Sequence, residues 1–417
     1  MKKFLAVLLA LVMILSVSVF SFADGATEIT LWTYPIGKWT DEATVSALLA
    51  DFEAANPGIK VSVEYLDYTS GDDKVNTAIE GGQAPDLIME GPERLIANWG
   101  AKGLMVDLSD IVPEGTYESV LSSCTSANGE VYELPVCMIA HCMAINRDVF
   151  EAAGALQYLN EETHTWNSTE DFLKAVQAVY DAGYDYVGTI YCGGQGGDQG
   201  TRALVTNLNG GTYANAEHTE YTFASEENAT ALSRLCAQDG INFDTAIVAS
   251  DEIANFVNGT FQMAFCWNNS QEVNNADALG FDVLPMAFPS DSTPVLQGGI
   301  WGFGIFNNGD EARIEAAKKF IQYMTSDEEY LKTVEATSYA PVREFDAYAG
   351  DELFAEYNIV SPMLGDYYQI TLGWTTARTE WWNMLQRVSE TDGSVEAILA
   401  EMTLAQDAAN AAAAAEA

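Results

Sequence analysis

Aromatic side chains gather where the first expected strand of the chain ends. The run 29–32 has a β-type sequence, and Trp32, Tyr34 and Trp39 follow at its carboxyl end in a loop that we expect to be exposed. Planar rings can stack against the C–H faces of a sugar, while neighbouring polar side chains bond its hydroxyl groups. The alternative is that the rings pack in a core or between lobes. We interpret Trp32 and Tyr34 as candidate binding residues and favour packing for Trp39.

Polar candidates follow other expected elements. Glu90 and Glu93 come directly after a short apolar strand, although acids at the start of a helix need no function. Gln195 and Asp198 lie in a glycine-rich stretch that has neither GxGxxG spacing nor the lysine of a Walker motif. We therefore interpret this stretch as a flexible cleft loop and not as a phosphate cradle.

Glycines and tryptophans mark two further candidate positions. At Gly299, beside Trp301, a missing side chain would let a ligand approach the backbone. Near the end of the chain, three tryptophans lie within residues 374–382, which is more than a core needs. We favour Trp374 and Arg378 of this segment as residues that face a ligand.

Catalysis has little support in the sequence. His141, His164 and His218 are isolated, and neither GxSxG nor HExxH occurs. Paired carboxylates could serve a glycosidase, but chance pairs are expected among 61 acidic residues. We therefore predict no catalytic residues, no cofactor and no metal site.

A strand, helix, strand unit positions the first aromatic group. After the strand at 29–32, Val45, Leu48, Leu49 and Phe52 recur at helical spacing, and a second strand is expected at 59–66. A crossover of this kind is right-handed, so the two strands are parallel and helices cover the sheet. Ligands bind at the carboxyl ends of such strands. Because strands and helices continue to alternate, we predict an α/β fold.

Composition limits the domain count and the partners. A chain of 417 residues is long enough for two lobes. Its 18 basic and 61 acidic residues give a net charge of −43, which repels nucleic acid and anionic lipid. We expect neither as a partner. A cationic ligand or a salty habitat remains an alternative to a simply well-solvated surface.

The first residues resemble a secretory signal. Lys2 and Lys3 precede the apolar run 4–20, and small residues stand at positions 21 and 23. We interpret residues 1–23 as a cleaved signal peptide, with an uncleaved membrane anchor as the alternative. The mature protein should then be soluble outside the cytoplasm.

The six cysteines show no zinc-type spacing, because no CxxC pair occurs. Cys137 and Cys142 form the one close pair, and on a single strand their side chains would lie about 16 Å apart on opposite faces. We expect mostly buried thiols.

Several segments, taken in order, resemble the extracytoplasmic solute-binding proteins of ABC importers, in particular the carbohydrate-binding family that includes maltose-binding proteins. The matching segments are residues 29–32, FEAANPGIKV at 52–61, APDLI at 84–88, LPV at 134–136, INRD at 145–148, TW at 165–166, FVNG at 256–259 with Met263, GGIWG at 298–302 and AAKKFI at 316–321. They extend over nearly the whole mature chain.

This resemblance implies a two-lobed fold of the periplasmic-binding-protein type. Each lobe would be a mixed, mostly parallel sheet flanked by helices, and several strands would form the hinge. It divides the chain into residues 24–137 plus 276–327 for the first lobe and 138–275 plus 328–417 for the second.

The resemblance also implies positions of ligand contact. It places Glu90, Glu93, Trp267 and Trp374 where relatives contact sugar, with Asn269 just after Trp267. For Trp267, core packing is an equal alternative.

The implied function is a monomeric extracytoplasmic binding protein that closes on a sugar or oligosaccharide and delivers it to the permease subunits of an ABC transporter. Alternatives are a binder of a cationic solute such as a polyamine and, less favoured, a secreted glycoside hydrolase. No cysteine follows the signal peptide, since the first is Cys124. A lipid anchor is therefore in doubt, and the protein would be periplasmic or held at the cell surface by other means.

Overall fold

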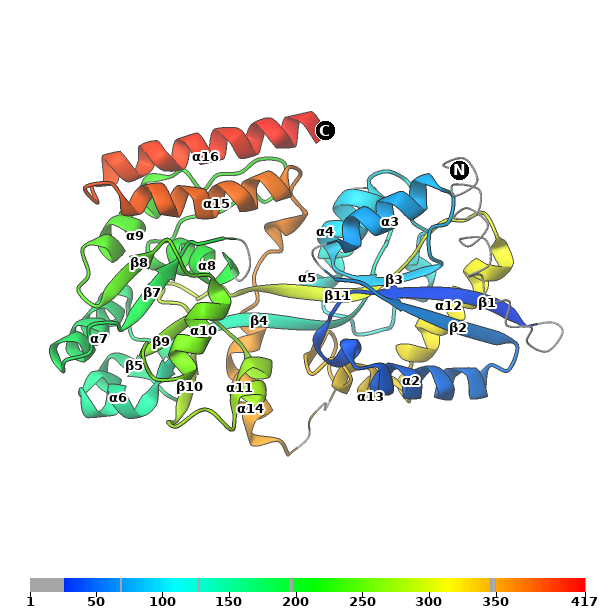
Figure 1. The fold of residues 1–417 in the computed structure, drawn as a ribbon, viewed down its shortest axis with the longest axis horizontal. Coiled ribbons are helices and arrows are strands. Elements are labelled where there is room, and N and C mark those ends of the chain that lie inside the picture. Colours follow the sequence, from blue (N-terminus) through cyan, green and yellow to red (C-terminus); the bar gives the residue numbers. More distant parts are fainter. Residues whose placement is uncertain are drawn as a thin grey trace, which may run out of the picture.

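Two α/β lobes lie side by side in the computed structural model, which describes residues 26–67, 70–126, 128–194, 198–345, 348 and 350–416. The long strands β4 (Leu134–Asn146) and β11 (Gln297–Ile305) run from one lobe into the other (Figure 1). The expected signal peptide lies outside the described residues.

The first lobe begins with the predicted crossover. Strand β1 (Thr27–Thr33), helix α2 (Glu42–Ala55) and strand β2 (Ile59–Tyr65) form the unit, and β1 pairs in parallel with β2 and with β3 (Leu87–Glu90). The side chain of Asp41 caps α2 by accepting hydrogen bonds from two backbone amides. The apolar positions of α2 are buried, so the predicted helical period is confirmed.

Shorter elements complete the first lobe. They are η1 (Gly37–Thr40), α3 (Gly71–Glu80), α4 (Pro92–Arg94), the π-helix η2 (Leu95–Gly100), η3 (Ser109–Ile111), α5 (Glu118–Ser123), α12 (Glu311–Met324), α13 (Tyr330–Glu335) and β12 (Ala340–Pro341).

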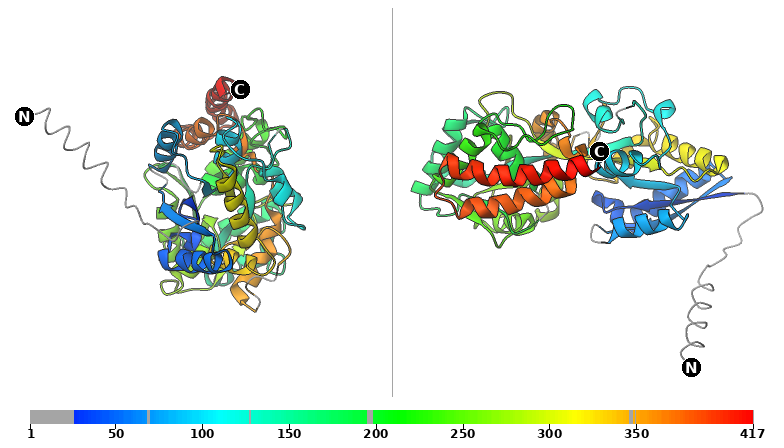
Figure 2. Two further views of the ribbon diagram at one scale, coloured as in Figure 1. Left: turned by 90° about the vertical axis from the view of Figure 1, so that its right-hand side faces the viewer. Right: turned by 90° about the horizontal axis from the view of Figure 1, so that it is seen from above.

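The second lobe is richer in helix. Its first half contains α6 (Arg147–Ala152), η4 (Ala155–Tyr158), β5 (Leu159–Asn160), β6 (Thr165–Trp166), α7 (Thr169–Asp181), β7 (Gly188–Tyr191), α8 (Asp198–Leu208), α9 (Glu226–Cys236) and β8 (Ile241–Asp244). Its second half contains α10 (Ala249–Val257), β9 (Met263–Trp267), α11 (Asn269–Asn275), β10 (Val283–Met286), α14 (Glu352–Val360), η5 (Ser361–Met363), η6 (Tyr368–Ile370), α15 (Trp374–Ser389) and α16 (Val395–Glu416). Helices α15 and α16 pack side by side along this lobe (Figure 2).

The two lobes share one sheet through the hinge strands. Its order is β10, β4, β11, β3, β1, β2, and both β9 and β12 also pair with β4. Because β4 and β11 pair with each other and with their neighbours in antiparallel fashion, parallel pairing among the described strands is confined to β1 with β2, β1 with β3, and β7 with β8. The sheet is therefore mixed, and the predicted α/β fold with a multi-strand hinge is confirmed. The expectation of mostly parallel strands is wrong, because the hinge strands pair with their neighbours in antiparallel fashion.

Each lobe has its own hydrophobic core. The residues that form these cores place the boundaries between the lobes elsewhere than at the expected positions 276 and 328. Residues 283–296 pack in the core of the second lobe, whereas Tyr330, Val334 and Val342 pack in that of the first. We therefore propose that lobe 1 comprises residues 26–138 and 300–345, and that lobe 2 comprises residues 140–296 and 354–416.

The loop after β1 is not the exposed aromatic loop that the sequence suggested. Trp39 is fully buried and its ring lies 5.6 Å from that of Phe303. The loop passes so close to the 337–339 segment that a Cβ atom at Gly37 would lie 1.6 Å from the carbonyl oxygen of Thr337. Close packing of these backbones, made possible by Gly37, encloses the ring.

Side chains bond the backbone at the starts of two helices in the second lobe. The Ser168 hydroxyl caps α7 by accepting from the amide of Asp171 at 3.0 Å. Helix α10 begins at Ala249, and the Asp251 carboxylate accepts from the amide of Val248, the residue before it, at 3.0 Å.

The thiol expectation is confirmed, since all six cysteines are free and, apart from the half-buried Cys236, buried. Within the described part of the chain, no helix is both long and apolar enough to cross a membrane.

One buried acid makes the stability of the second lobe depend on pH. Glu252 on α10 is fully buried and accepts from the amide of Phe265 at 2.6 Å, and burial raises its pKa from 4.5 to about 8. The folded state thus holds a proton that the unfolded chain releases above its lower pKa. This contribution to stability is present in full below pH 4.5 and is lost as the pH rises through 8.

We expect the free energy of unfolding to fall between pH 5 and pH 8, by at most about 1.4 kcal/mol per pH unit from this group. Glu252→Gln should flatten that slope in urea titrations at several pH values, while Glu226→Gln at an exposed position of α9 should leave it unchanged. An equal slope in wild type and Glu252→Gln would show that Glu252 is ionised in the folded protein.

Candidate ligand-binding site between the lobes

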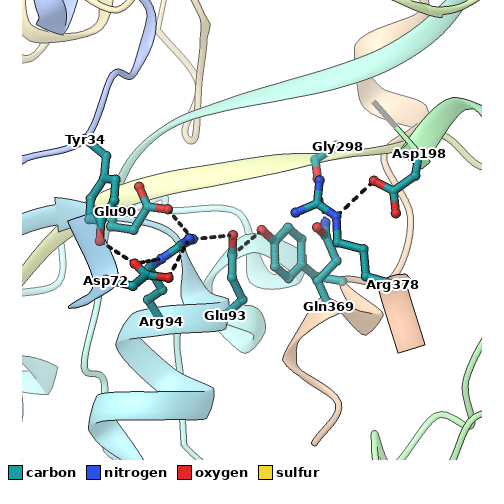
Figure 3. A network of polar contacts seen from close by, with 10 residues as sticks. Tyr34, Asp72, Glu90, Glu93, Arg94, Asp198, Gly298, Gln369 and Arg378 are labelled. Carbon is teal, nitrogen blue, oxygen red and sulfur yellow. Dashed lines mark hydrogen bonds and ion pairs between the residues drawn. The ribbon is translucent and has the colours of Figure 1, made fainter. Parts of the chain in front are cut away.

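Arg94 is the centre of a polar network in the first lobe. Its Nε atom lies 2.7 Å from Asp72 Oδ1 and its Nη1 atom 2.8 Å from Glu90 Oε1. The hydroxyl of Tyr34 donates to the same Asp72 carboxylate (Figure 3). Tyr34 follows β1 and Glu90 ends β3, so the carboxyl ends of two parallel strands meet here, as expected for an α/β sheet.

Burial shapes the charges of this network. Glu90 is only 1% exposed, and loss of solvation raises the pKa of its carboxyl, while Arg94 opposes that rise. Burial alone would lower the pKa of the Arg94 guanidinium, but Glu90 and Asp72 raise it above its ordinary value, so the group stays charged. Burial and Asp72 also raise the pKa of Tyr34, which keeps its hydroxyl protonated as a donor.

A second arginine and carboxylate group forms in the other lobe. Asp198, the first residue of α8, accepts from Arg378 Nε at 3.1 Å and also from Arg202 Nη1. Arg202 is fully buried, and its guanidinium lies 4.9 Å from the ring of Trp374 and donates to the Tyr368 hydroxyl at 2.8 Å. Its Nη2 atom has no hydrogen-bond partner among the described residues.

Glu93 on α4 extends the network of the first lobe toward the second. Its Oε1 atom is 3.5 Å from Arg94 Nη1, and its Oε2 atom accepts from the Tyr367 hydroxyl at 2.8 Å. Burial lowers the pKa of Arg378 in the second lobe. Two residues of the first lobe also act on this pKa, since Glu93 raises it and Arg94 lowers it. The polar groups of the two lobes therefore interact electrostatically. Figure 3 shows these polar side chains as a row from Tyr34 to Asp198.

The structure brings several sequence-predicted residues together in this row, and one lies at its edge. Tyr34, Glu90, Glu93, Asp198 and Arg378 all take part. Trp374 lies at the edge of the row against Arg202. Gln195 lies outside the described residues.

Other predicted residues have different surroundings. Trp32 lies on β1, where the Lys74 ammonium sits 5.3 Å from its ring centroid. The space beside Gly299 is filled by the Trp301 ring, since a Cβ atom there would lie 2.2 Å from that ring. The Trp301 ring therefore occupies this space in the present conformation, and the approach of a ligand to the backbone at Gly299 stays a prediction. Trp301 in turn stacks on Tyr339 at 5.1 Å.

The strand end at Trp267 serves packing and contact between lobes. Trp267 is fully buried, and its Nε1 atom donates to the Tyr357 hydroxyl at 2.6 Å, so it is a core residue in this structure. Asn269 donates to the carbonyl oxygen of Ser338 at 3.1 Å, which ties the second lobe to the first.

Sequence reasoning missed several members of the site. Asp72 stands in the first turn of α3, where acids are common, so nothing distinguished it. The i, i+4 spacing of Asp198 and Arg202 was a visible signal of an ion pair. His141 is half-buried on β4, and burial together with Arg202 lowers its pKa to about 4, so its ring is neutral at ordinary pH.

Glu133, just before β4, is a further buried acid near the site. It is fully buried, and neither carboxyl oxygen has a hydrogen-bond partner in the described ranges. Burial, with Glu93 and Glu90 adding to it, raises the pKa of this carboxyl well above its ordinary value. Perturbed acids of this kind concentrate at functional sites.

Truncation of Trp267 and of Trp374 to alanine should distinguish a core residue from a residue of the candidate site. We expect Trp267→Ala to lower the free energy of unfolding by about 3–5 kcal/mol, because it leaves a cavity in a closed core. Trp374→Ala should cost clearly less, since its ring is half-buried. Denaturant titration of both variants measures this. Equal losses would mean that Trp374 is also a core residue.

Comparisons with known proteins agree with this architecture. The family model described as bacterial extracellular solute-binding protein matches residues 47–356. An ABC substrate-binding protein of Listeria monocytogenes, solved with cycloalternan, is similar with a TM-score of 0.69 and 21% identity, covering 93% of this chain and 98% of that one.

Two further solved structures show the same fold. The cyclic α-maltosyl-1,6-maltose binding protein of Arthrobacter globiformis has a TM-score of 0.72 at 19% identity, covering 93% of this chain and 99% of that one. The UgpB protein of Mycobacterium tuberculosis, solved with glycerophosphocholine, has a TM-score of 0.71 at 17% identity, covering 92% and 98%.

Curated relatives match over a shorter stretch. A binding protein of Brucella abortus is 31% identical over 106 residues, which is 25% of this chain and 26% of the relative. The chain thus spans about a quarter of the length of the curated relatives it matches. Because the family model covers residues 47–356, more than half of the chain, the protein belongs to the bacterial extracellular solute-binding protein family, as its sequence predicted.

Proposed function

We propose that the protein captures a sugar or oligosaccharide between its lobes and delivers it to the permease of an ABC transporter. The observation that carries this proposal is the row of arginines and carboxylates contributed by both lobes, with Trp374 at its edge. An aromatic ring beside dense donors and acceptors suits a polyhydroxylated ligand.

The balance of charge favours a neutral ligand. Arg94 is paired with Asp72 and Glu90, and both Arg202 and Arg378 with Asp198. Burial also raises the pKa of the Glu90 carboxyl, which favours its neutral form relative to an exposed acid. The row therefore has little unpaired charge with which to bind a charged ligand. Such a ligand would lose its solvation on entering the site without gaining an oppositely charged partner.

Similar proteins support the same class of ligand. One structural neighbour is described in complex with cycloalternan, and another is described as a cyclic α-maltosyl-1,6-maltose binding protein. A third is described with glycerophosphocholine, which carries a cationic group, and this keeps a cationic solute as the second candidate.

Closure on the ligand follows from the division of the site. Each lobe holds only part of the contacts, so a ligand that touches both parts stabilises the closed arrangement selectively. The hinge strands β4 and β11, which connect the lobes, are the elements that bend or twist in such a closure.

Family membership places the protein outside the cytoplasm, among binding proteins. We further propose that residues 1–23 are removed as a signal peptide and that the mature protein acts as a monomer.

Calorimetric titration tests the ligand class. With maltose, maltotriose, cellobiose and raffinose, we expect at least one to bind with micromolar affinity, which corresponds to about −8 kcal/mol. Heat with spermidine and with none of these sugars would replace the sugar proposal by the cationic one. Release of reducing ends from the oligosaccharides over time would instead indicate a hydrolase.

A matched pair of substitutions on α15 tests the row itself. Arg378→Gln removes the ion pair with Asp198 and should weaken binding of the sugar that gives heat by about tenfold or more. Arg387→Gln, also on α15, removes a surface pair with Glu401 of α16 and should leave affinity unchanged. Equal affinities for both variants would exclude Arg378 from the site.

A further inference from the structure

A short segment between η5 and α15, residues 363–370, lies along the boundary of the two lobes, and we name it the strap. Its backbone is bound to the start of β11, because the amide of Leu296 donates to the carbonyl oxygen of Met363 at 2.8 Å and the amide of Gly365 donates to that of Leu296 at 3.0 Å. The strap is thus attached to a hinge strand where that strand leaves the second lobe.

Tyr367 of the strap belongs to the first lobe by its contacts. Its ring packs in the core of lobe 1 and is only 4% exposed. Its hydroxyl donates to Glu93 Oε2 at 2.8 Å. Burial and Glu93 raise the pKa of this phenol well above its ordinary value, so it stays a donor. We call the polar residues that each lobe contributes to the row its half-site, the first in lobe 1 and the second in lobe 2. Tyr367 therefore fixes one carboxylate oxygen of the first half-site.

Tyr368, the next residue, belongs to the second lobe. Its ring packs in the core of lobe 2 and stacks on Tyr213 with centroids 4.5 Å apart. Its hydroxyl accepts from Arg202 Nε at 2.8 Å. Since Arg202 also holds Asp198, which pairs with Arg378, Tyr368 fixes the orientation of the second half-site.

Gln369 connects the pair of tyrosines to the hinge. Its Nε2 atom donates to the carbonyl oxygen of Gly298 on β11 at 2.7 Å, and its side chain is 5% exposed. Both residues are labelled in Figure 3, in the part of the view that also contains Arg378. Three consecutive side chains thus contact the first half-site, the second half-site and the strand between them.

We propose that the Tyr367 and Tyr368 pair positions both half-sites at once and couples them, so that ordering one half-site by a ligand orders the other. The physical reason is the short tether. Two adjacent Cα atoms are 3.8 Å apart, so a movement of Glu93 that shifts Tyr367 also shifts the backbone that carries Tyr368. The proposal rests on the proposed function, because it concerns how the same site is built.

Hydrogen exchange of the unliganded protein tests the coupling without any sugar. Tyr367→Phe removes the bond to Glu93 in lobe 1, yet we expect exchange to rise by about fivefold around residues 198–204 of lobe 2 as well. Tyr368→Phe removes the bond to Arg202 in lobe 2, and exchange should rise similarly around residues 90–96 of lobe 1. If each tyrosine acted only within the lobe that its hydroxyl contacts, hydrogen exchange in the opposite lobe would not change.

The matched control is Tyr357→Phe. Tyr357 is a buried tyrosine of α14 whose hydroxyl donates to Glu272 at 2.5 Å and accepts from Trp267 at 2.6 Å, both inside lobe 2. It should lower stability and leave exchange around residues 90–96 unchanged. If each strap variant changes exchange only in the lobe that its own hydroxyl contacts, the coupling is refuted.

Titration with the sugar panel then separates this proposal from the proposed function. If a sugar binds wild type, each strap variant should weaken it by about tenfold, and the double variant by less than the product of the two single effects. Full additivity would contradict coupling. If no sugar binds wild type, the proposed function fails, and the exchange result still decides on the strap.

Discussion

Arginines held by carboxylates, the half-buried Arg94 and the fully buried Arg202, are the interaction on which the rest of this site depends. A charge removed from water is tolerated only when a partner of opposite charge and good geometry replaces the solvent. Arg94 meets this condition with Asp72 and Glu90, and Arg202 meets it with Asp198. Each pair comes from a different lobe, so each lobe keeps its own charges satisfied and can move as a unit.

The fold places these pairs where they can meet. Tyr34 follows β1, Glu90 ends β3 and Asp198 begins α8. Strands β4 and β11 connect the two groups through a common sheet. The lobes have separate cores, which confines their relative motion to the strands and the strap between them. A site built in halves on two cores is what allows a ligand to shift the balance between open and closed forms.

Much of the fold was predictable because its signals are local. The period of Val45, Leu48, Leu49 and Phe52 gave helix α2, and parallel pairing of its flanking strands followed from the crossover rule. Glu90 and Glu93 could be proposed because they come at the end of an apolar strand, Asp198 because it lies in a glycine-rich stretch, and Arg378 because its segment is rich in tryptophan. Trp267 and Gly299 show the limit, since burial of the first and coverage of the second by Trp301 depend on tertiary contacts. Asp72 and Tyr367 could not be found from sequence because their partners lie 22 and 274 positions away.

The account centres on a site that is complete only when both lobes contribute to it. Small-angle X-ray scattering with and without the sugar that binds in calorimetry tests this most directly. We expect the radius of gyration to fall at the same sugar concentrations that release heat, and to stay constant in Arg378→Gln at those concentrations. Heat without any change in the scattering profile would contradict closure and place the ligand on one lobe alone.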